Sequence, residues 1–210
     1  GCLDSITLDV YVDSIPQADF GFASVCTNDE LFFTDNSTFS PDTYLWQFGD
    51  GGVSILTNPS HTYTTAGTYP VTLTVEYASN GCTHSITQNV EAYPRTTPAF
   101  NANTPCLGEN TDFIDATIIN PTTWEWDFGD ASAGSFVQNP SHLYNTQGFF
   151  DITLVTSNVY GCFDTLVQQI EIYGLPTADF TFTTVCEGAE TQFMDNSIDD
   201  VSWQWDFGDA

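Results

Sequence analysis

The chain has almost no positive charge. Its 210 residues contain no lysine, and Arg95 is the single arginine, against 28 Asp and Glu residues, so the formal net charge is -27 at pH 7. Nucleic acids and anionic membrane surfaces are bound through clustered Lys and Arg side chains. The composition therefore excludes both as partners, and the acidic surface is typical of a soluble, self-repelling protein.

Metal and catalytic motifs are also missing. There is no Cys-x-x-Cys pair to indicate zinc, and no Asp-x-Asp-x-Asp-Gly loop to indicate a contiguous calcium site. No nucleophile with a base, metal triad or recurrent carboxylate pair can be named, so we expect a segment that is not an enzyme. We predict no cofactor. Ca²⁺ is the one candidate ion, because carboxylates distant in the sequence could come together in the fold to bind it.

No long apolar run, signal peptide or transit sequence is present. We therefore expect no direct membrane insertion in this segment. If the segment is cut from a longer chain, however, the lack of a signal peptide says nothing about export. Helical apolar stripes are absent too. At 41% hydrophobic and 15% aromatic residues, the chain is nevertheless apolar enough to form packed cores.

What the chain does have is a repeat of 80 residues. Two series of cysteines keep this spacing. The first is Cys2, Cys82 and Cys162, each preceded by Gly, and the second is Cys26, Cys106 and Cys186, of which the first and last are preceded by Val. An aromatic turn motif recurs with nearly the same period: Trp46, Phe48, Gly49 and Asp50; Trp126, Phe128, Gly129 and Asp130; Trp205, Phe207, Gly208 and Asp209. Such periodicity indicates tandem modules.

Aligning the copies predicts four parts. They are the C-terminal strand of a preceding repeat (1–13), two complete repeats (14–93 and 94–173) and the N-terminal half of a further repeat (174–210). We expect each repeat's closest partners to be its neighbours in the same chain.

Short segments with alternating apolar and polar residues predict half-buried strands. They are 18–22, 31–34, 44–48, 69–75 and 85–90 in the first copy, and 150–155 in the second. About seven strands in 80 residues, separated by Gly, Asn, Asp and Pro, predict an all-β fold of tandem immunoglobulin-like sandwiches, arranged head to tail.

The aromatic motif has a structural interpretation. A tryptophan in the middle of a strand fills the space between two sheets, so we expect Trp46, Trp126 and Trp205 in cores rather than stacked on a ligand. The following Gly and Asp supply turn chemistry. His61 and His142 lack an evident cysteine or carboxylate partner motif, which favours hydrogen-bonded structural histidines over catalytic bases.

These motifs closely resemble tandem PKD (polycystic kidney disease) domains. The family pattern Trp-x-Phe-Gly-Asp-Gly, His-x-Tyr and Gly-x-Tyr-x-Val-x-Leu-x-Val falls on 46–51, 61–63 and 67–75, and again on 126–130, 142–144 and 148–155. Ala131 and Ala210 replace the last Gly, and Phe150 replaces the Tyr. The added cysteines resemble the version found in very long surface proteins of gliding bacteria that are exported by the type IX system.

The cysteines indicate an oxidising, extracellular setting, and two disulfide arrangements are open. Within repeats, Cys26 would join Cys82 and Cys106 would join Cys162. If the strands alternate in direction, however, the first turn and the last turn lie at opposite ends of a strand, about 20–27 Å apart, whereas bonded Cα atoms lie within about 7 Å. This favours a bond between repeats, from Cys26 to Cys162.

The resulting hypothesis is a non-catalytic array, the stalk or filament of a large bacterial cell-surface adhesin used in attachment or gliding, with force transmitted along it. Other filament subunits, surface glycans and host or substrate polymers are its candidate partners. The alternative is a polysaccharide- or protein-binding module, or a spacer, of a secreted multidomain hydrolase. For binding, the candidate contacts are tyrosines: Tyr11, Tyr77, Tyr93, Tyr160 and Tyr173.

Overall fold

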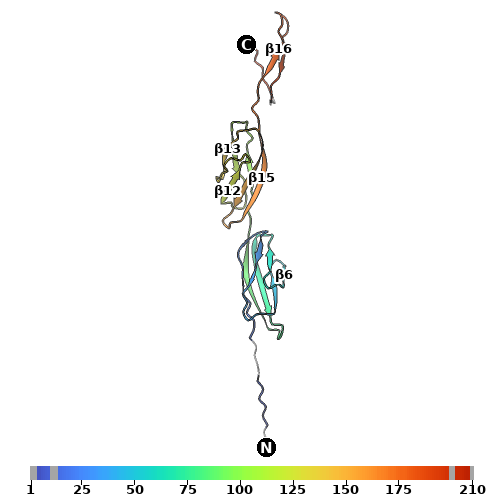
Figure 1. Cartoon of the computed structure of the whole chain (residues 1–210), viewed down its shortest axis with the longest axis vertical. Coiled ribbons are helices and arrows are strands. Elements are labelled where there is room, and N and C mark those ends of the chain that lie inside the picture. Colours follow the sequence, from blue (N-terminus) through green and yellow to red (C-terminus); the bar gives the residue numbers. More distant parts are fainter. Residues whose placement is uncertain (1–3, 10–13, 199–201, 209–210) are drawn as a thin grey trace. The chain divides into compact units, whose positions relative to one another are not determined.

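The structure is a computed structural model that describes residues 4–9, 14–198 and 202–208. These residues form strands and turns with no helix, which confirms the predicted all-β, immunoglobulin-like fold (Figure 1). Over the same residues, nothing long and apolar enough to cross a membrane as a helix is found. The chain divides into two compact units, 1–95 and 96–210, each described below by itself.

The first unit is a sandwich of short and long strands. Its larger sheet has the order β2-β9-β8-β5-β6, and the pairs β1-β4 and β3-β7 supply the opposing layer. The strands are β1 Phe20–Gly21, β2 Val25–Cys26, β3 Glu30–Phe32, β4 Thr34–Asp35, β5 Thr43–Gln47, β6 Val53–Ser54, β7 Ser60–Thr62, β8 Gly67–Glu76 and β9 Thr83–Tyr93.

The second unit repeats this plan in its complete copy. One sheet has the order β10-β11-β13 and the other β12-β14-β15. Their strands are β10 Phe100–Ala102, β11 Asn110–Asp115, β12 Thr123–Asp127, β13 Ser141–Leu143, β14 Gly148–Ser157 and β15 Phe163–Ile172. Downstream lies a separate pair, β16 Phe180–Phe182 with β17 Phe193–Asp195, which belongs to the third copy.

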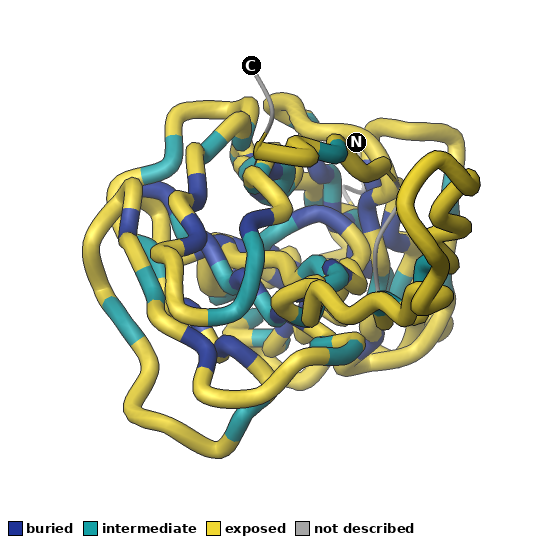
Figure 2. The backbone as a smooth tube through the Cα atoms, turned by 90° about the horizontal axis from the view of Figure 1, so that it is seen from above, coloured by how far each residue is buried: buried dark blue, intermediate teal, exposed yellow. Residues whose placement is uncertain are grey.

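Alternation along the long strands builds each core. In β8, Val71, Leu73 and Val75 are fully buried while the residues between them are only partly covered. Side chains of a strand point alternately to its two faces, so the period of two in the sequence becomes one buried face. Figure 2 shows the buried positions in dark blue along the backbone.

Aromatic rings fill the centre of each complete sandwich. Trp46 and Trp126 are almost completely buried, and each meets a phenylalanine of the opposing layer edge to face. The ring centroids are 5.1 Å apart for Phe20 and Trp46, and 5.2 Å apart for Phe100 and Trp126. Edge-to-face pairs of buried rings stabilise by about 0.5–1.5 kcal/mol beyond the area they bury.

The third copy keeps this arrangement of rings, but its rings are not covered by long strands. The centroids of Phe180 and Trp205 are 5.4 Å apart, yet Phe180 is 51% exposed and Trp205 is only partly buried. Among the described residues of this copy, no strand corresponds to β8 or β9, which cover the equivalent rings in the first unit. Trp205 therefore lies on an open face rather than in a closed core. Asp209 of the third turn motif lies outside the described residues.

The strands differ from the sequence prediction mainly in length. The segments expected at 69–75 and 85–90 extend to 67–76 and 83–93 because a ten-residue ladder pairs them without a break. The assumption that all strands alternate in direction is wrong at one place. Cys26 lies in β2, not in a turn, and β2 runs parallel to the end of β9.

Candidate functional site

The most elaborate repeated structure is the turn after the buried tryptophan. Gly49 has φ of +85°, and a Cβ there would meet the Pro70 ring and backbone at 3.0 Å. Only glycine combines that conformation with so close an approach. The Tyr63 hydroxyl donates to the Phe48 carbonyl oxygen over 2.9 Å, so a buried side chain directly after β7 holds the turn from inside the core.

Asp50 fixes the outer part of this turn through both carboxylate oxygens. Its Oδ1 accepts from the Gly52 N–H at 2.9 Å, and its Oδ2 lies 2.7 Å from His61 Nε2. Because a carboxylate only accepts, the imidazole donates from Nε2. The His61 ring stacks on Phe48 with centroids 4.2 Å apart and planes 7° apart.

The second repeat builds the same unit from equivalent residues. Asp130 Oδ1 accepts from the Ser132 N–H at 3.0 Å, and its Oδ2 lies 2.8 Å from His142 Nε2. The His142 ring stacks on Phe128 at 4.1 Å, and Tyr144 donates to the Phe128 carbonyl over 3.0 Å. We name this set the Asp–His clasp: Asp50, His61, Phe48 and Tyr63 in the first repeat, and Asp130, His142, Phe128 and Tyr144 in the second.

The clasp favours the ionised carboxylate. Burial alone would raise the pKa of Asp50, but the hydrogen bonds from His61 and from the Gly52 N–H outweigh it and lower that pKa below its ordinary value. The pKa of Asp130 is lowered in the same way by Ser132 and His142 against the effect of burial. Burial, and then the nearby Asp50 charge, raises the pKa of the Tyr63 hydroxyl, which stays a neutral donor.

The histidines therefore have a structural partner that the sequence did not reveal. His61 and His142 are hydrogen-bonded as expected, but each partner is a carboxylate, contrary to the interpretation that none was available. The signal was present in the recurrence of both the Phe-Gly-Asp turn and the His-x-Tyr motif. The turn itself uses only one carboxylate oxygen of Asp50, which leaves the second oxygen to bind His61 across the layers.

The cysteines fall into two groups. Cys26 and Cys162 form a disulfide, whereas Cys82, Cys106 and Cys186 are free thiols. The bond between repeats is thus present, and the alternative pairs, Cys26 with Cys82 and Cys106 with Cys162, are wrong. Cys2 lies outside the described residues.

Strand geometry explains why the bond within a repeat does not form. Cys26 is paired with Tyr93 at the C-terminal end of β9, whereas Cys82 immediately precedes its first residue, Thr83. At about 3.3 Å per residue, these positions are roughly 35 Å apart, several times the separation that a disulfide spans. Cys26 and Cys82 therefore lie at opposite ends of β9, as expected, even though β2 runs parallel to that strand.

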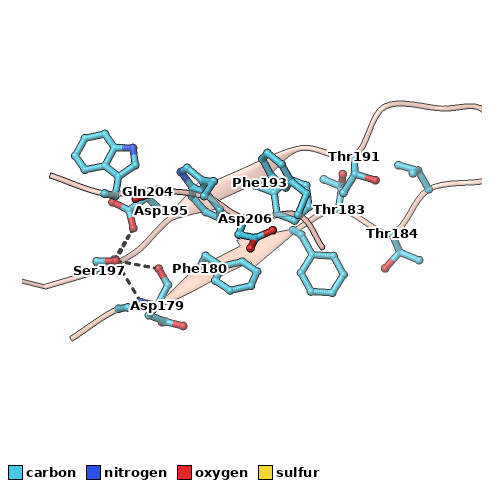
Figure 3. A pocket seen from close by; sticks show the side chains of 16 residues that line it. Asp179, Phe180, Thr183, Thr184, Thr191, Phe193, Asp195, Ser197, Gln204 and Asp206 are labelled. Carbon is cyan, nitrogen blue, oxygen red and sulfur yellow. Dashed lines mark hydrogen bonds between the residues drawn. The ribbon is translucent and has the colours of Figure 1, made fainter. Parts of the chain in front are cut away.

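A cavity of about 730 Å³ lies on the open face of the third copy (Figure 3). Its aromatic walls include Phe180, Phe193 and Trp205, which correspond to core residues of the complete repeats. The Ser197 hydroxyl donates to Asp195 Oδ1 over 2.6 Å at one side. The cavity is therefore the uncovered core of a sandwich rather than a catalytic pocket.

The tyrosines proposed as ligand contacts do not gather into one site. Tyr77 donates to the Phe39 carbonyl, and Tyr93 accepts from Thr27 through its carbonyl oxygen at 2.9 Å. Tyr160 and Tyr173 are 56% and 47% exposed. Tyr11 lies outside the described residues. Across the part of the chain that the structure describes, no group of three His, Cys, Asp or Glu side chains is placed to hold a metal ion.

A two-layer sandwich with a buried tryptophan, a glycine turn and a tyrosine behind it defines an immunoglobulin-like module. The family model described as "PKD domain" matches residues 13–92 and 96–172, well over half of the chain. The chain therefore belongs to the PKD domain family and contains two PKD domains, which are non-catalytic modules.

Relatives with this module include two proteases. The pre-pro-metalloprotease PrtV of Vibrio cholerae is 30% identical over 138 residues, which cover 62% of this chain and 14% of PrtV. Collagenase ColA of Bacillus cereus is 45% identical over 53 residues, or 23% of this chain and 6% of ColA. The matched segment thus spans about a seventh of the length of PrtV and a smaller share of the length of ColA.

Solved structures give similar matches. The PKD1 domain of V. cholerae PrtV is 29% identical, with 38% of this chain and 99% of that domain covered and a TM-score of 0.35. The PKD1 domain of Vibrio anguillarum Epp is 28% identical, with 40% and 99% covered and a TM-score of 0.36.

Proposed function

We propose that this chain is a segment of a non-catalytic, extracellular array that forms the stalk or filament of a large bacterial cell-surface adhesin, used in attachment or gliding. The observation that carries the proposal is the Cys26–Cys162 disulfide, which joins two successive repeats covalently in addition to the backbone. A protein whose modules act independently has no need of such a bond. One that maintains a fixed succession of modules under load does.

The same bond supports an extracellular location. Disulfides form and persist in oxidising compartments. This one closes a loop of about 137 residues, and the chain-entropy model assigns a loop of that length about 5 kcal/mol of stabilisation. The absence of lysine and the net charge of -27 suit a protein surface that repels other copies of itself.

A second candidate function is a spacer, or a polysaccharide- or protein-binding module, of a secreted hydrolase. It is favoured by the named relatives, because PrtV is a metalloprotease and ColA a collagenase, and each contains a matching segment. In that case the array would separate a catalytic domain from another domain, or direct it to a polymer, and would still contribute no catalytic group itself.

Locating the protein on its source cells distinguishes the two functions. An antibody raised against residues 14–173 would be applied to intact cells and to the cell-free medium, and the captured protein would be sequenced by mass spectrometry. We expect label along surface filaments that is removed by protease treatment of intact cells. Capture mainly from the medium, attached to a hydrolase domain, would establish the spacer instead. Label only after the cells are broken open would contradict both.

A further inference from the structure

The disulfide uses only two positions of a cysteine pattern that recurs through the chain. Cys106 follows Cys26 by one period, and Cys82 precedes Cys162 by one period. Both Cys82 and Cys106 are partly buried free thiols.

Cys106 occupies the same local frame as Cys26. Cys26 pairs in parallel with Tyr93, and Cys106 pairs in parallel with Tyr173, the equivalent residue one period later. The carbonyl oxygen of each cysteine accepts from the N–H of the residue three positions later at 3.1 Å. The N–H of the residue directly after each cysteine donates to the carbonyl oxygen of the paired tyrosine, at 2.9 Å after Cys26 and 2.8 Å after Cys106. Backbone position and strand partner therefore coincide.

Cys82 directly precedes the last long strand of its repeat, as Cys162 does, although the hydrogen bonds of the preceding turn have a different residue spacing. The Cys82 N–H donates to Asn80 Oδ1 at 2.9 Å, and the Cys162 N–H donates to Asn158 Oδ1 at 3.2 Å. The Cys82 carbonyl accepts from the Tyr77 N–H at 3.0 Å, and the Cys162 carbonyl accepts from the Asn158 N–H at 3.1 Å. The tight turn that precedes the last long strand thus presents a cysteine in both repeats.

Neither free thiol has a partner within its own repeat. Cys106 lies beside Tyr173, after the end of β15, while Cys162 directly precedes Phe163 at the start of that strand. The ten residues of β15 separate them by roughly 35 Å at about 3.3 Å per residue. The same separation applies to Cys82 and Cys26 across β9. A bond from either thiol must therefore reach another repeat, as the Cys26–Cys162 bond does.

We propose that Cys106 and Cys82 are the open halves of the same kind of disulfide. Cys106 bonds the cysteine equivalent to Cys162 in a following repeat, and Cys82 bonds the cysteine equivalent to Cys26 in a preceding repeat. Each repeat is then joined to both neighbours. The oxidant is a small-molecule disulfide such as oxidised glutathione: two thiols lose two protons and two electrons, and the small disulfide is reduced to two thiols. This inference holds for a stalk and for a spacer alike.

The test completes the third copy. The full chain is extended after Ala210 by a copy of residues 132–173, which adds strands equivalent to β13, β14 and β15 and a cysteine equivalent to Cys162. The protein is refolded with reduced and oxidised glutathione and mapped by mass spectrometry of non-reduced peptides. We expect Cys106 to be joined to the added cysteine, with the Cys26–Cys162 bond unchanged. A bond from the added cysteine to Cys186, or a free thiol at both Cys106 and the added position, would overturn the proposal.

Two variants keep the result interpretable. In the extended chain, Cys106→Ser should leave the added cysteine as a thiol, and a bond from it to any other cysteine would count against the proposal. In the unextended chain, Cys26→Ser tests the geometry without added residues. We expect thiols at both Cys106 and Cys162 under the same redox conditions. A Cys106–Cys162 bond there would show that the two positions can meet within one repeat, and would overturn the proposal independently.

Discussion

The two complete repeats share an aromatic centre but differ in the aliphatic residues around it. Leu31 and Val75 of the first repeat are replaced by Thr111 and Thr156 at the same positions in the ladders. Both threonines are fully buried, and neither hydroxyl has a hydrogen-bond partner. The tryptophan, its phenylalanine partner and the Asp–His clasp are otherwise nearly superimposable in their contacts.

The difference shows that the module tolerates imperfect packing at these two positions, because both repeats form the sandwich. A buried polar group without a partner costs about 1–3 kcal/mol. We therefore expect the second repeat to be the less stable one.

The largest effect should come from removing a central ring. Trp126→Ala deletes a side chain that is 1% exposed, and such truncations cost about 3–5 kcal/mol. In calorimetry, the transition of the second repeat should shift down or disappear while that of the first persists. Trp46→Ala should do the reverse. Trp203→Ala, at a site 65% exposed, is the matched control and should change neither transition. Equal loss of both transitions from one substitution would show that the repeats do not unfold separately.

The next effect concerns the clasp and depends on pH. Because the pKa of Asp50 is lower in the folded state than its ordinary value of 3.8, its contribution is present above that value and is lost as pH falls through the folded value. Asp50→Asn should cost the first repeat about 2 kcal/mol at pH 7, the typical value of a hydrogen bond to a charged group.

The measurement is chemical denaturation of both repeats between about pH 2 and pH 7, the range in which an Asp of lowered pKa changes stability. In the Asp50→Asn variant, acid should lower the free energy of unfolding of the first repeat by less than in the unmodified chain. The effect of acid on the second repeat, where Asp130 is intact, should stay unchanged. Asp130→Asn should give the mirror image. An unaltered acid profile in both variants would show that other carboxylates dominate.

A smaller effect, and the most direct test of the comparison, is an isosteric exchange in the core. Thr156→Val removes the unpaired hydroxyl and should stabilise the second repeat by about 1 kcal/mol, whereas Val75→Thr should destabilise the first by about 1–3 kcal/mol. Denaturant midpoints of the two transitions report both changes. A second repeat that is destabilised by Thr156→Val would mean that the Thr156 hydroxyl has a hydrogen-bond partner in solution.

The smallest effect belongs to the turn. Ala131 adopts a φ of +60° where the first repeat has Gly51 at +99°. An L-residue in this region costs about 1 kcal/mol relative to glycine. Ala131→Gly should therefore stabilise the second repeat by up to about that amount, and Gly51→Ala should destabilise the first, both read from thermal midpoints. No change in either would indicate that the turn relaxes when the side chain is added.

The sequence predicted the class of fold because alternation and the Trp-x-Phe-Gly-Asp motif are local signals. It also predicted the Cys26–Cys162 pair, since the length of a strand alone separates Cys26 from Cys82. It did not predict the Asp50–His61 bond, because residues eleven apart meet only after β5 and β7 are placed in opposing layers. Nor did it predict the unsatisfied Thr156 hydroxyl, which depends on what surrounds that position in three dimensions.

The Cys26–Cys162 bond has one more consequence, for cleavage of the backbone. Every peptide bond between residues 26 and 162 lies inside a closed covalent ring. A protease that cuts once in this stretch, for example between the exposed residues Ile55 and Leu56 after β6, opens the ring but releases nothing. Separation into fragments then requires either a second cut or a reductant. Outside the cell, where proteases are common and reductants scarce, damage at one peptide bond would not sever the protein.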